Sequence, residues 1–181
     1  MHPQLAALRQ QFDDASARAA RMVARVDDTT FQARPLRGGW SAAECLVHLS
    51  LTTAGMLPRI DGALAHGRPG TADSHRYGRG FAGALLAWYM EPPVHLRTST
   101  LAAFEPGSTG PKESVLARFE ASQRDLVQRL ERASGLNLDD LRITSPFNAR
   151  VSYPAYGAFC ILAAHARRHL WQAERALTPS G

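Results

Sequence analysis

Two histidines lie four residues apart near the C-terminal end of the sequence, and this spacing can bring two metal ligands together. His165 and His169 belong to a stretch with helical periodicity, and side chains at positions i and i+4 of a helix share one face. The apolar stripe of that stretch runs through Leu162, so both imidazoles are expected on its inner face. Two imidazoles placed in this way can bind one divalent ion.

The candidate third ligand is His48. It lies in the most apolar helical stretch of the chain, between Val47 and Leu49, where an imidazole without a partner would cost free energy. The three histidines can also be read as hydrogen-bonded core residues, because a pair at i and i+4 arises by chance in many arginine-rich helices. Residue types and spacing alone leave both interpretations open.

Three residues near these histidines each allow two roles. Glu44 lies three residues after Ser41, which favours a helix capping box over a carboxylate that supports His48. Cys45 could add a fourth ligand and so close the site, although three histidines alone are favoured. Gln172 could orient a water on the ion or line the opening of the site.

The remaining conspicuous residues are expected to be structural. Trp40 is interpreted as a packing anchor and Cys160 as a small core residue. The other histidines lie at the N-terminus or in loop segments and are expected to be exposed to solvent: His2, His66, His75 and His95.

Helical periodicity predicts an all-α chain that forms a four-helix bundle. The predicted helices cover residues 4–27, residues 41–58 or beyond, residues 111–135 and residues 152–177. The second is expected to be kinked at Pro58. Strand signals are weak and confined to the short segments 96–101 and 141–144. The core is expected to include Phe12, Phe119, Leu126, Leu130 and Leu162.

The segment between the second and third predicted helices, residues 66–110, is too long for a simple turn between neighbouring antiparallel helices. It is therefore expected to cross the bundle, with a short extra helix over residues 80–90, where Phe81, Leu85 and Trp88 recur at helical spacing.

Composition narrows the class of protein. With 181 residues the chain is expected to form one domain over residues 1–181, and 45% hydrophobic residues suffice for an ordinary core. No apolar run reaches the length of a membrane span, and two cysteines cannot form a disulfide framework, so a cytoplasmic protein is expected. The net charge of +5 comes from scattered arginines, which disfavours nucleic-acid binding.

Two segments resemble motifs of the DinB-like (DinB/YfiT) superfamily. Residues 40–49 match the pattern W-S-x-x-E-x-x-x-H-L, and residues 165–172 match H-x-x-x-H-x-x-Q. The order of the motifs, the long crossover and the amphipathic third helix also fit, so the resemblance covers nearly the whole chain. It implies a four-helix bundle with a crossover between the second and third helices, and a divalent metal held by His48, His165 and His169.

The resemblance also sets expectations about function. Several members of the superfamily are thiol S-transferases that use low-molecular-weight thiols, and others are linked to metal-dependent isomerisation or hydrolysis. A metal-dependent enzyme of thiol-transfer or detoxification type is therefore expected, with a non-catalytic metal- or small-ligand-binding stress protein as the alternative. The expected ion is zinc or nickel, with iron or manganese as alternatives. The expected partners are a small-molecule substrate and, if the protein forms a homodimer, a second copy of the chain.

Overall fold

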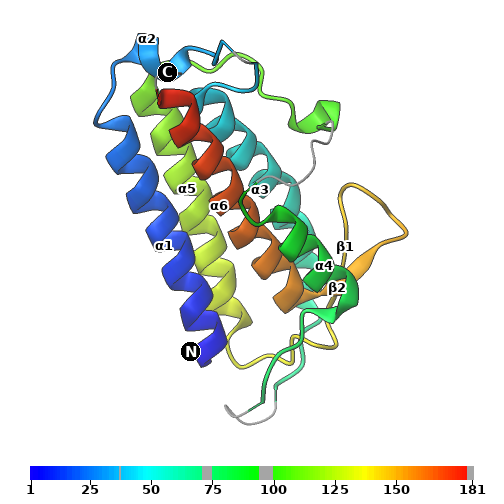
Figure 1. The fold of residues 1–181 in the computed structure, drawn as a ribbon. Coiled ribbons are helices and arrows are strands. Elements are labelled where there is room, and N and C mark those ends of the chain that lie inside the picture. The colour runs from blue at the N-terminus through cyan, green and yellow to red at the C-terminus, as the bar shows by residue number, and fades with distance from the viewer. Residues whose placement is uncertain (37, 71–74, 94–99, 179–181) are drawn as a thin grey trace.

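The computed structural model describes residues 1–36, 38–70, 75–93 and 100–178, and there the chain is mostly helical (Figure 1). Residues 94–99, which include His95 and most of the weak candidate strand 96–101, lie outside this part. The helices are α1 (Pro3–Val23), α2 (Asp28–Gln32), α3 (Ala42–Ala65), α4 (Gly80–Met90), the 3₁₀ turn η1 (Ala102–Phe104), α5 (Lys112–Ala133) and α6 (Ala155–Leu177). Two short strands, β1 (Arg142–Thr144) and β2 (Ser152–Pro154), form an antiparallel pair.

Four long helices lie side by side along the molecule (Figure 1). Helix α1 contacts α5 and α6, and α3 contacts the same two helices. Helices α1 and α6 run toward the end of the molecule that carries the C-terminus, whereas α3 and α5 run in the opposite direction. The chain between α3 and α5 must therefore return along the length of the molecule, and α4 and η1 lie on this path.

The predicted core residues are buried, as expected. Phe12, Phe119 and Leu130 expose none of their surface, and Leu126 and Leu162 expose 1% and 6%. Removing a side chain of this size from water stabilises the fold by about 1.5–3 kcal/mol. The apolar stripes of the long helices thus supply the hydrophobic core of the protein.

The expectation that the last helix begins at residue 152 is wrong. Residues 152–154 instead pair with β1, and Ile143 lies opposite Tyr153, with both side chains buried. Helix α6 begins only at Ala155, whose backbone N–H donates to the carbonyl of Leu141 at 2.7 Å. Strand β1 lies within the weak candidate segment 141–144, whereas β2 was not foreseen, because a three-residue strand is too short to leave an alternating pattern in a sequence.

The first predicted helix ends earlier than its periodicity suggests, because α1 stops at Val23 and the short helix α2 follows. The carboxylate of Asp27 accepts a hydrogen bond from the Thr30 N–H at 2.8 Å and so caps the start of α2. An aspartate at this place favours a new helix start over continuation of the old one.

The expectation that His2 is exposed is also wrong, since this side chain is 7% exposed. Its Nδ1 accepts a hydrogen bond from the Gln4 N–H at 3.2 Å, and its Nε2 lies 2.7 Å from the carbonyl oxygen of His75. The imidazole thus caps α1 and connects the N-terminus to the segment between α3 and α4. His66 and His75 are exposed, as expected.

The predicted short helix between α3 and α5 is confirmed as α4, but Phe81, Leu85 and Trp88 face away from the protein. Phe81 is 87% exposed, whereas the small residues Gly83 and Ala87 are buried and α4 packs against α6. A Cβ atom on Gly157 of α6 would lie 2.5 Å from the carbonyl oxygen of Arg79. Close packing of the two backbones therefore depends on small residues, not on bulky ones.

Because of this close approach, we expect Gly157→Ala to lower the free energy of unfolding by about 1–3 kcal/mol, the usual cost of overpacking. Gly62→Ala is the matched control, since nothing lies within 4 Å of a Cβ there and the exchange should raise helix stability by up to about 1 kcal/mol. Urea denaturation of both variants measures the difference. Equal stability of Gly157→Ala and the wild type would contradict the close packing of α4 on α6.

Among the described residues, no helix combines the length and the apolar character that crossing a membrane requires.

Candidate metal centre

The predicted capping box of Ser41 and Glu44 fixes the start of α3, and His48 lies one turn beyond Glu44. The Ser41 hydroxyl accepts a hydrogen bond from the Glu44 N–H at 3.1 Å, and the Glu44 carboxylate accepts one from the Ser41 N–H at 2.9 Å. Arg34 also donates to this carboxylate. Burial alone would raise the pKa of Glu44, but the hydrogen bonds from Arg34 and Ser41 outweigh it and lower the pKa. Glu44 is thus an ionised cap.

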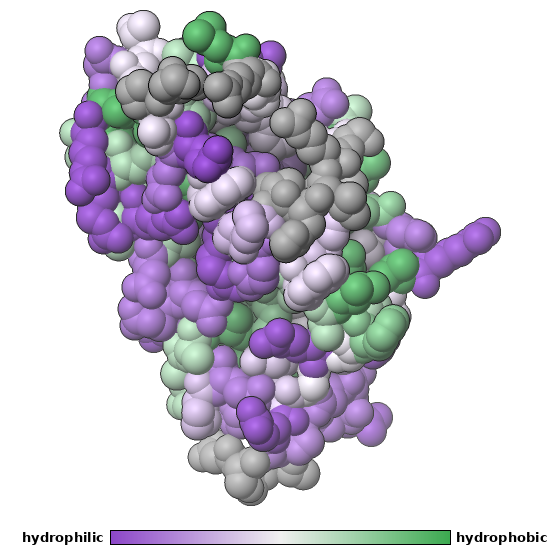
Figure 2. All heavy atoms as spheres, in the orientation of Figure 1, coloured by the Kyte–Doolittle hydropathy of each residue, from purple (hydrophilic) through white to green (hydrophobic). Residues whose placement is uncertain are grey.

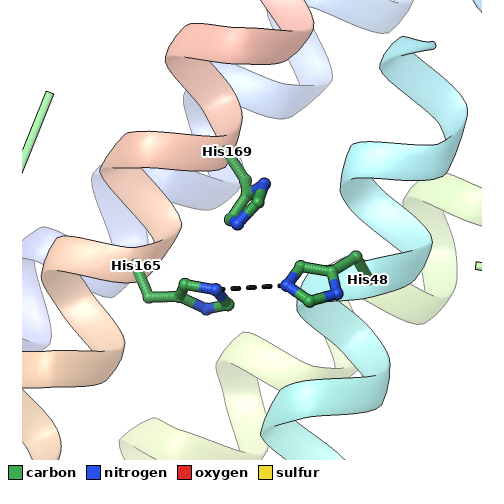
Figure 3. A group of neighbouring side chains, drawn as sticks. All are labelled: His48, His165 and His169. Atoms are coloured by element: carbon green, nitrogen blue, oxygen red, sulfur yellow. Dashed lines mark hydrogen bonds between the residues drawn. The ribbon is translucent and has the colours of Figure 1, made fainter. Parts of the chain in front are cut away.

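The three candidate ligands converge between α3 and α6 (Figure 3). All three are buried, and each offers one ligand atom within 4.8 Å of the others. The Nε2 atoms of His48 and His165 lie 3.2 Å apart, and the ring of His169 has its centroid 4.5 Å from each of the other two. The structure therefore brings together the residues that the sequence pairs only by spacing and motif.

The orientation of His48 is set by a backbone carbonyl from the segment between α3 and α5. Its Nδ1 lies 2.8 Å from the carbonyl oxygen of Phe104 in η1. A carbonyl oxygen only accepts hydrogen bonds, so Nδ1 carries the proton and Nε2 of the neutral ring keeps its lone pair, directed at His165. Metal-ligating histidines are commonly held in this way. Sequence reasoning missed this contact, because a carbonyl oxygen gives no signal in residue type.

Burial keeps the imidazoles neutral. It lowers the pKa of His165 to about 3, and the nearby His48 and Arg168 act in the same direction. Burial likewise lowers the pKa of His48, and that of His169 falls well below its usual value although the Gln172 side chain opposes the shift. A neutral imidazole is the form that binds a metal ion.

The donor set fits a divalent ion. Nδ1 of His169 is buried and has no hydrogen-bond partner among the described residues, although such an atom usually finds one. Two nitrogens bound to one tetrahedral zinc at about 2.0–2.1 Å would lie about 3.3 Å apart, close to the 3.2 Å between His48 and His165. An ion between the rings would take the place of the hydrogen bond between His48 and His165, and it would give the His169 ring a partner that the described residues do not supply.

The neighbours of the three histidines have distinct roles. Trp40 packs on them, with its ring stacked on His169 at 5.6 Å and tilted against His48 at 4.7 Å. Cys45 lies in the hydrophobic core and is not part of the ligand group found in the described residues, so nothing there supports a closed Cys-His₃ site. Cys160 is likewise a buried core residue.

Arg168 is a neighbour that the sequence did not single out. It is 5% exposed and donates a hydrogen bond to the carbonyl oxygen of Tyr89 in α4 at 2.9 Å. Its charge helps to lower the pKa values of His165 and His169. Arg168 thus connects the face of α6 that carries His165 and His169 to α4.

A small apolar cavity of about 30 Å³ lies beside His165, comparable to the volume of about one water molecule. Its wall combines α3, α6 and the crossover, and includes Thr52, Met56, Met90, Phe104, Phe147 and Leu162. This cavity beside His165 therefore has room only for a small group.

Comparison with known families agrees with the geometry. The family model described as DinB superfamily matches residues 11–173. This range includes both histidine motifs and all four long helices, apart from the first residues of α1 and the last residues of α6. Comparison with curated proteins and with solved structures found no match. Because the family match spans most of the sequence, the chain belongs to the DinB superfamily.

Proposed function

We propose that the protein binds one divalent metal ion through His48, His165 and His169 and uses it as an enzyme of thiol S-transferase or detoxification type. The observation that carries the proposal is the convergence of three buried, neutral imidazoles, one of which has a buried nitrogen without a hydrogen-bond partner. The metal would be zinc or nickel, with iron or manganese as alternatives, since a set of three imidazoles suits each of them.

The surrounding residues prepare these ligands. The carbonyl of Phe104 holds His48 in the tautomer that directs Nε2 at His165, and burial keeps all three rings unprotonated. Trp40 covers the rings of His48 and His169 and limits the access of water. Three neutral ligands leave a divalent charge uncompensated, which favours an anionic fourth ligand.

When bound, such an ion supplies Lewis acidity that lowers the pKa of a water molecule or thiol. In the thiol reaction the thiol gives up its proton, its sulfur forms a bond to an electrophilic carbon, and the leaving group departs with the electron pair of the broken bond. The small cavity beside His165 favours a low-molecular-weight thiol over a large one.

We further propose that α1, α3, α5 and α6 constitute a four-helix bundle in which α4 and η1 belong to the crossover, and that residues 1–181 act as one domain. The contacts of α1 and α3 with both α5 and α6 support this arrangement. Two buried, unpaired cysteines favour a reducing compartment, so we place the protein in the cytoplasm. Its scattered arginines favour a small-molecule partner over nucleic acid.

The second candidate is a metal- or small-ligand-binding stress protein without turnover. The observation in its favour is the narrow cavity beside His165, which leaves little room for an electrophilic substrate. Three neutral ligands with no fourth protein ligand in the described residues favour the enzyme instead, because structural zinc sites usually have four.

The two candidates are separated by comparing metal-loaded and metal-free protein. We expect the loaded protein to join a small thiol to an electrophile faster than the metal-free protein, which should keep its helical circular dichroism because the core is apolar. Stoichiometric metal without any acceleration across a panel of thiols and electrophiles would favour the non-catalytic binder. Global unfolding on metal removal would indicate a structural ion.

A further inference from the structure

Phe104 contacts α3 at two places that are two helical turns apart. Its carbonyl oxygen lies 2.8 Å from Nδ1 of His48, and its ring lies against Gly55. His48 and Gly55 are seven residues apart, so they share one face of α3 and lie about 10 Å apart along its axis. One residue of η1 is thus fixed on α3 both by its backbone and by its side chain.

Gly55 provides the space that the Phe104 ring occupies. A Cβ atom on Gly55 would lie 2.7 Å from Cε1 and 3.1 Å from Cζ of this ring. Carbon atoms pack at about 3.5–4.0 Å, so a larger residue would push the ring away by about 1 Å. Gly55 lies within α3 and has no positive φ, so its backbone conformation does not require glycine. A glycine that costs a helix up to about 1 kcal/mol therefore serves the contact with Phe104.

The loop between β1 and β2 supplies a further contact to the same ring. The rings of Phe104 and Phe147 have centroids 5.5 Å apart and are tilted by 58°, which is a favourable aromatic arrangement. The loop is held by hydrogen bonds from the Ser145 N–H to the Val151 carbonyl oxygen at 2.8 Å and from the Phe147 N–H to the Ser145 hydroxyl at 3.2 Å. Phe104 is 8% exposed as a result of these contacts.

A purely structural role of the ring is the alternative, since Phe104 and Phe147 both line the small cavity beside His165. In that case a change at the ring would alter the stability of the fold and leave His48 unaffected. The geometry favours a role at the metal centre, because the same residue supplies the carbonyl that orients His48. A ring that is pushed outward moves this carbonyl with it, and a hydrogen bond of 2.8 Å is lost beyond about 3.2 Å.

We propose that Gly55 and Phe147 are positioning residues of the metal centre, because together they fix Phe104 and thereby the tautomer and orientation of His48. This inference rests on the proposed function, in which His48 is a metal ligand. Groups that orient a ligating histidine contribute about 10–100-fold to metal affinity. The pair of β1 and β2 thus contributes to the metal centre through Phe147, although it supplies none of the three histidines.

The zinc affinity of the full chain, measured by competition with a chromophoric chelator, provides the first test. We expect Gly55→Ala to weaken zinc binding at least about tenfold, because the new methyl group displaces the Phe104 ring. Gly62→Ala is the matched control on the same helix, since nothing lies within 4 Å of a Cβ there, and it should bind zinc as the wild type does. Equal zinc affinity of the two variants would overturn the proposal.

A second pair of variants tests the contact from the loop. Phe147 is 51% exposed, so Phe147→Ala is expected to fold, and it should weaken zinc binding about threefold because the contact with Gly55 remains. Phe81→Ala is its control. Phe81 is 87% exposed on α4, over which hydrophobic side chains gather in Figure 2, and its loss should leave zinc affinity unchanged. Equal zinc affinity of these two variants would overturn the role of Phe147.

Phe104→Leu shows whether the effect of Gly55→Ala passes through the ring. Leucine keeps the backbone carbonyl but lacks the Cε1 and Cζ atoms that a Cβ at position 55 would meet. In the Phe104→Leu background, Gly55→Ala should therefore cost no more than about twofold in zinc affinity, so the two effects should not add. An equal loss in both backgrounds would overturn the proposal.

Nuclear magnetic resonance of the metal-free protein separates this inference from the proposed function. The Nδ1 proton of His48 donates to the Phe104 carbonyl oxygen, so it should exchange slowly with water in the wild type and in Gly62→Ala. In Gly55→Ala we expect exchange at least about tenfold faster. Unchanged exchange in a folded Gly55→Ala variant would overturn the positioning role even if the wild type binds zinc. A wild type that takes up no metal would overturn the proposed function, and the exchange rates would still decide whether Gly55 positions His48.

Discussion

Replacing His169 with alanine is expected to remove most of the bound metal. The substitution takes away one of three ligands, and because the loss of a group that merely supports a ligand already lowers metal affinity 10–100-fold, we expect a loss of more than about 100-fold. The measurement is metal content per chain after dialysis against a weak chelator.

Cys45→Ala is the matched control for this experiment. Cys45 is buried in the hydrophobic core, and it is the side chain that the sequence suggested as a possible fourth ligand. The control should retain its metal, with at most a modest loss of stability. Equal metal loss from His169→Ala and Cys45→Ala would contradict the three-histidine site and support a Cys-His₃ site.

The second large effect is expected at His48. In both His48→Ala and His48→Asn, the rate of the thiol reaction should fall to that of the metal-free protein. The asparagine variant retains a side-chain amide that can donate to the Phe104 carbonyl but lacks an imidazole nitrogen for the metal. It therefore separates the loss of a ligand from the loss of a contact with the crossover.

The measurement for His48 is the initial rate with a small thiol and an electrophile, with circular dichroism as a check of folding. A metal-dependent rate that persists in a folded His48→Asn variant would show that His48 acts only through its hydrogen bond to η1. It would thereby contradict its assignment as a ligand.

The part of the site that could be predicted is the part encoded by local spacing. The i, i+4 pair His165 and His169 depends only on helix geometry, and the capping box of Ser41 and Glu44 only on the first turn of α3. His48 lies beside His165 and His169 only because α3 packs against α6. For that contact the sequence gave two indications, the apolar residues on either side of His48 and the family resemblance.

What could not be predicted depends on contacts between distant segments. The carbonyl oxygen of Phe104 contacts His48 although the two residues are 56 positions apart in the sequence. Every residue type has a backbone carbonyl, so the sequence gives no signal for this contact. For α4 the helical spacing of Phe81, Leu85 and Trp88 correctly predicted a helix, but it did not establish which face of the helix packs on the protein. The close approach of the Arg79 backbone to Gly157 explains why small residues face α6.

The most direct test of the metal centre is elemental analysis of the protein purified without a metal-affinity tag, together with the protein concentration from amino-acid analysis. We expect one divalent ion per chain in the wild type and a large loss in His169→Ala. Wild-type protein that contains no stoichiometric metal, and takes up none when dialysed against zinc, nickel, iron or manganese, would contradict the assignment of His48, His165 and His169 as ligands.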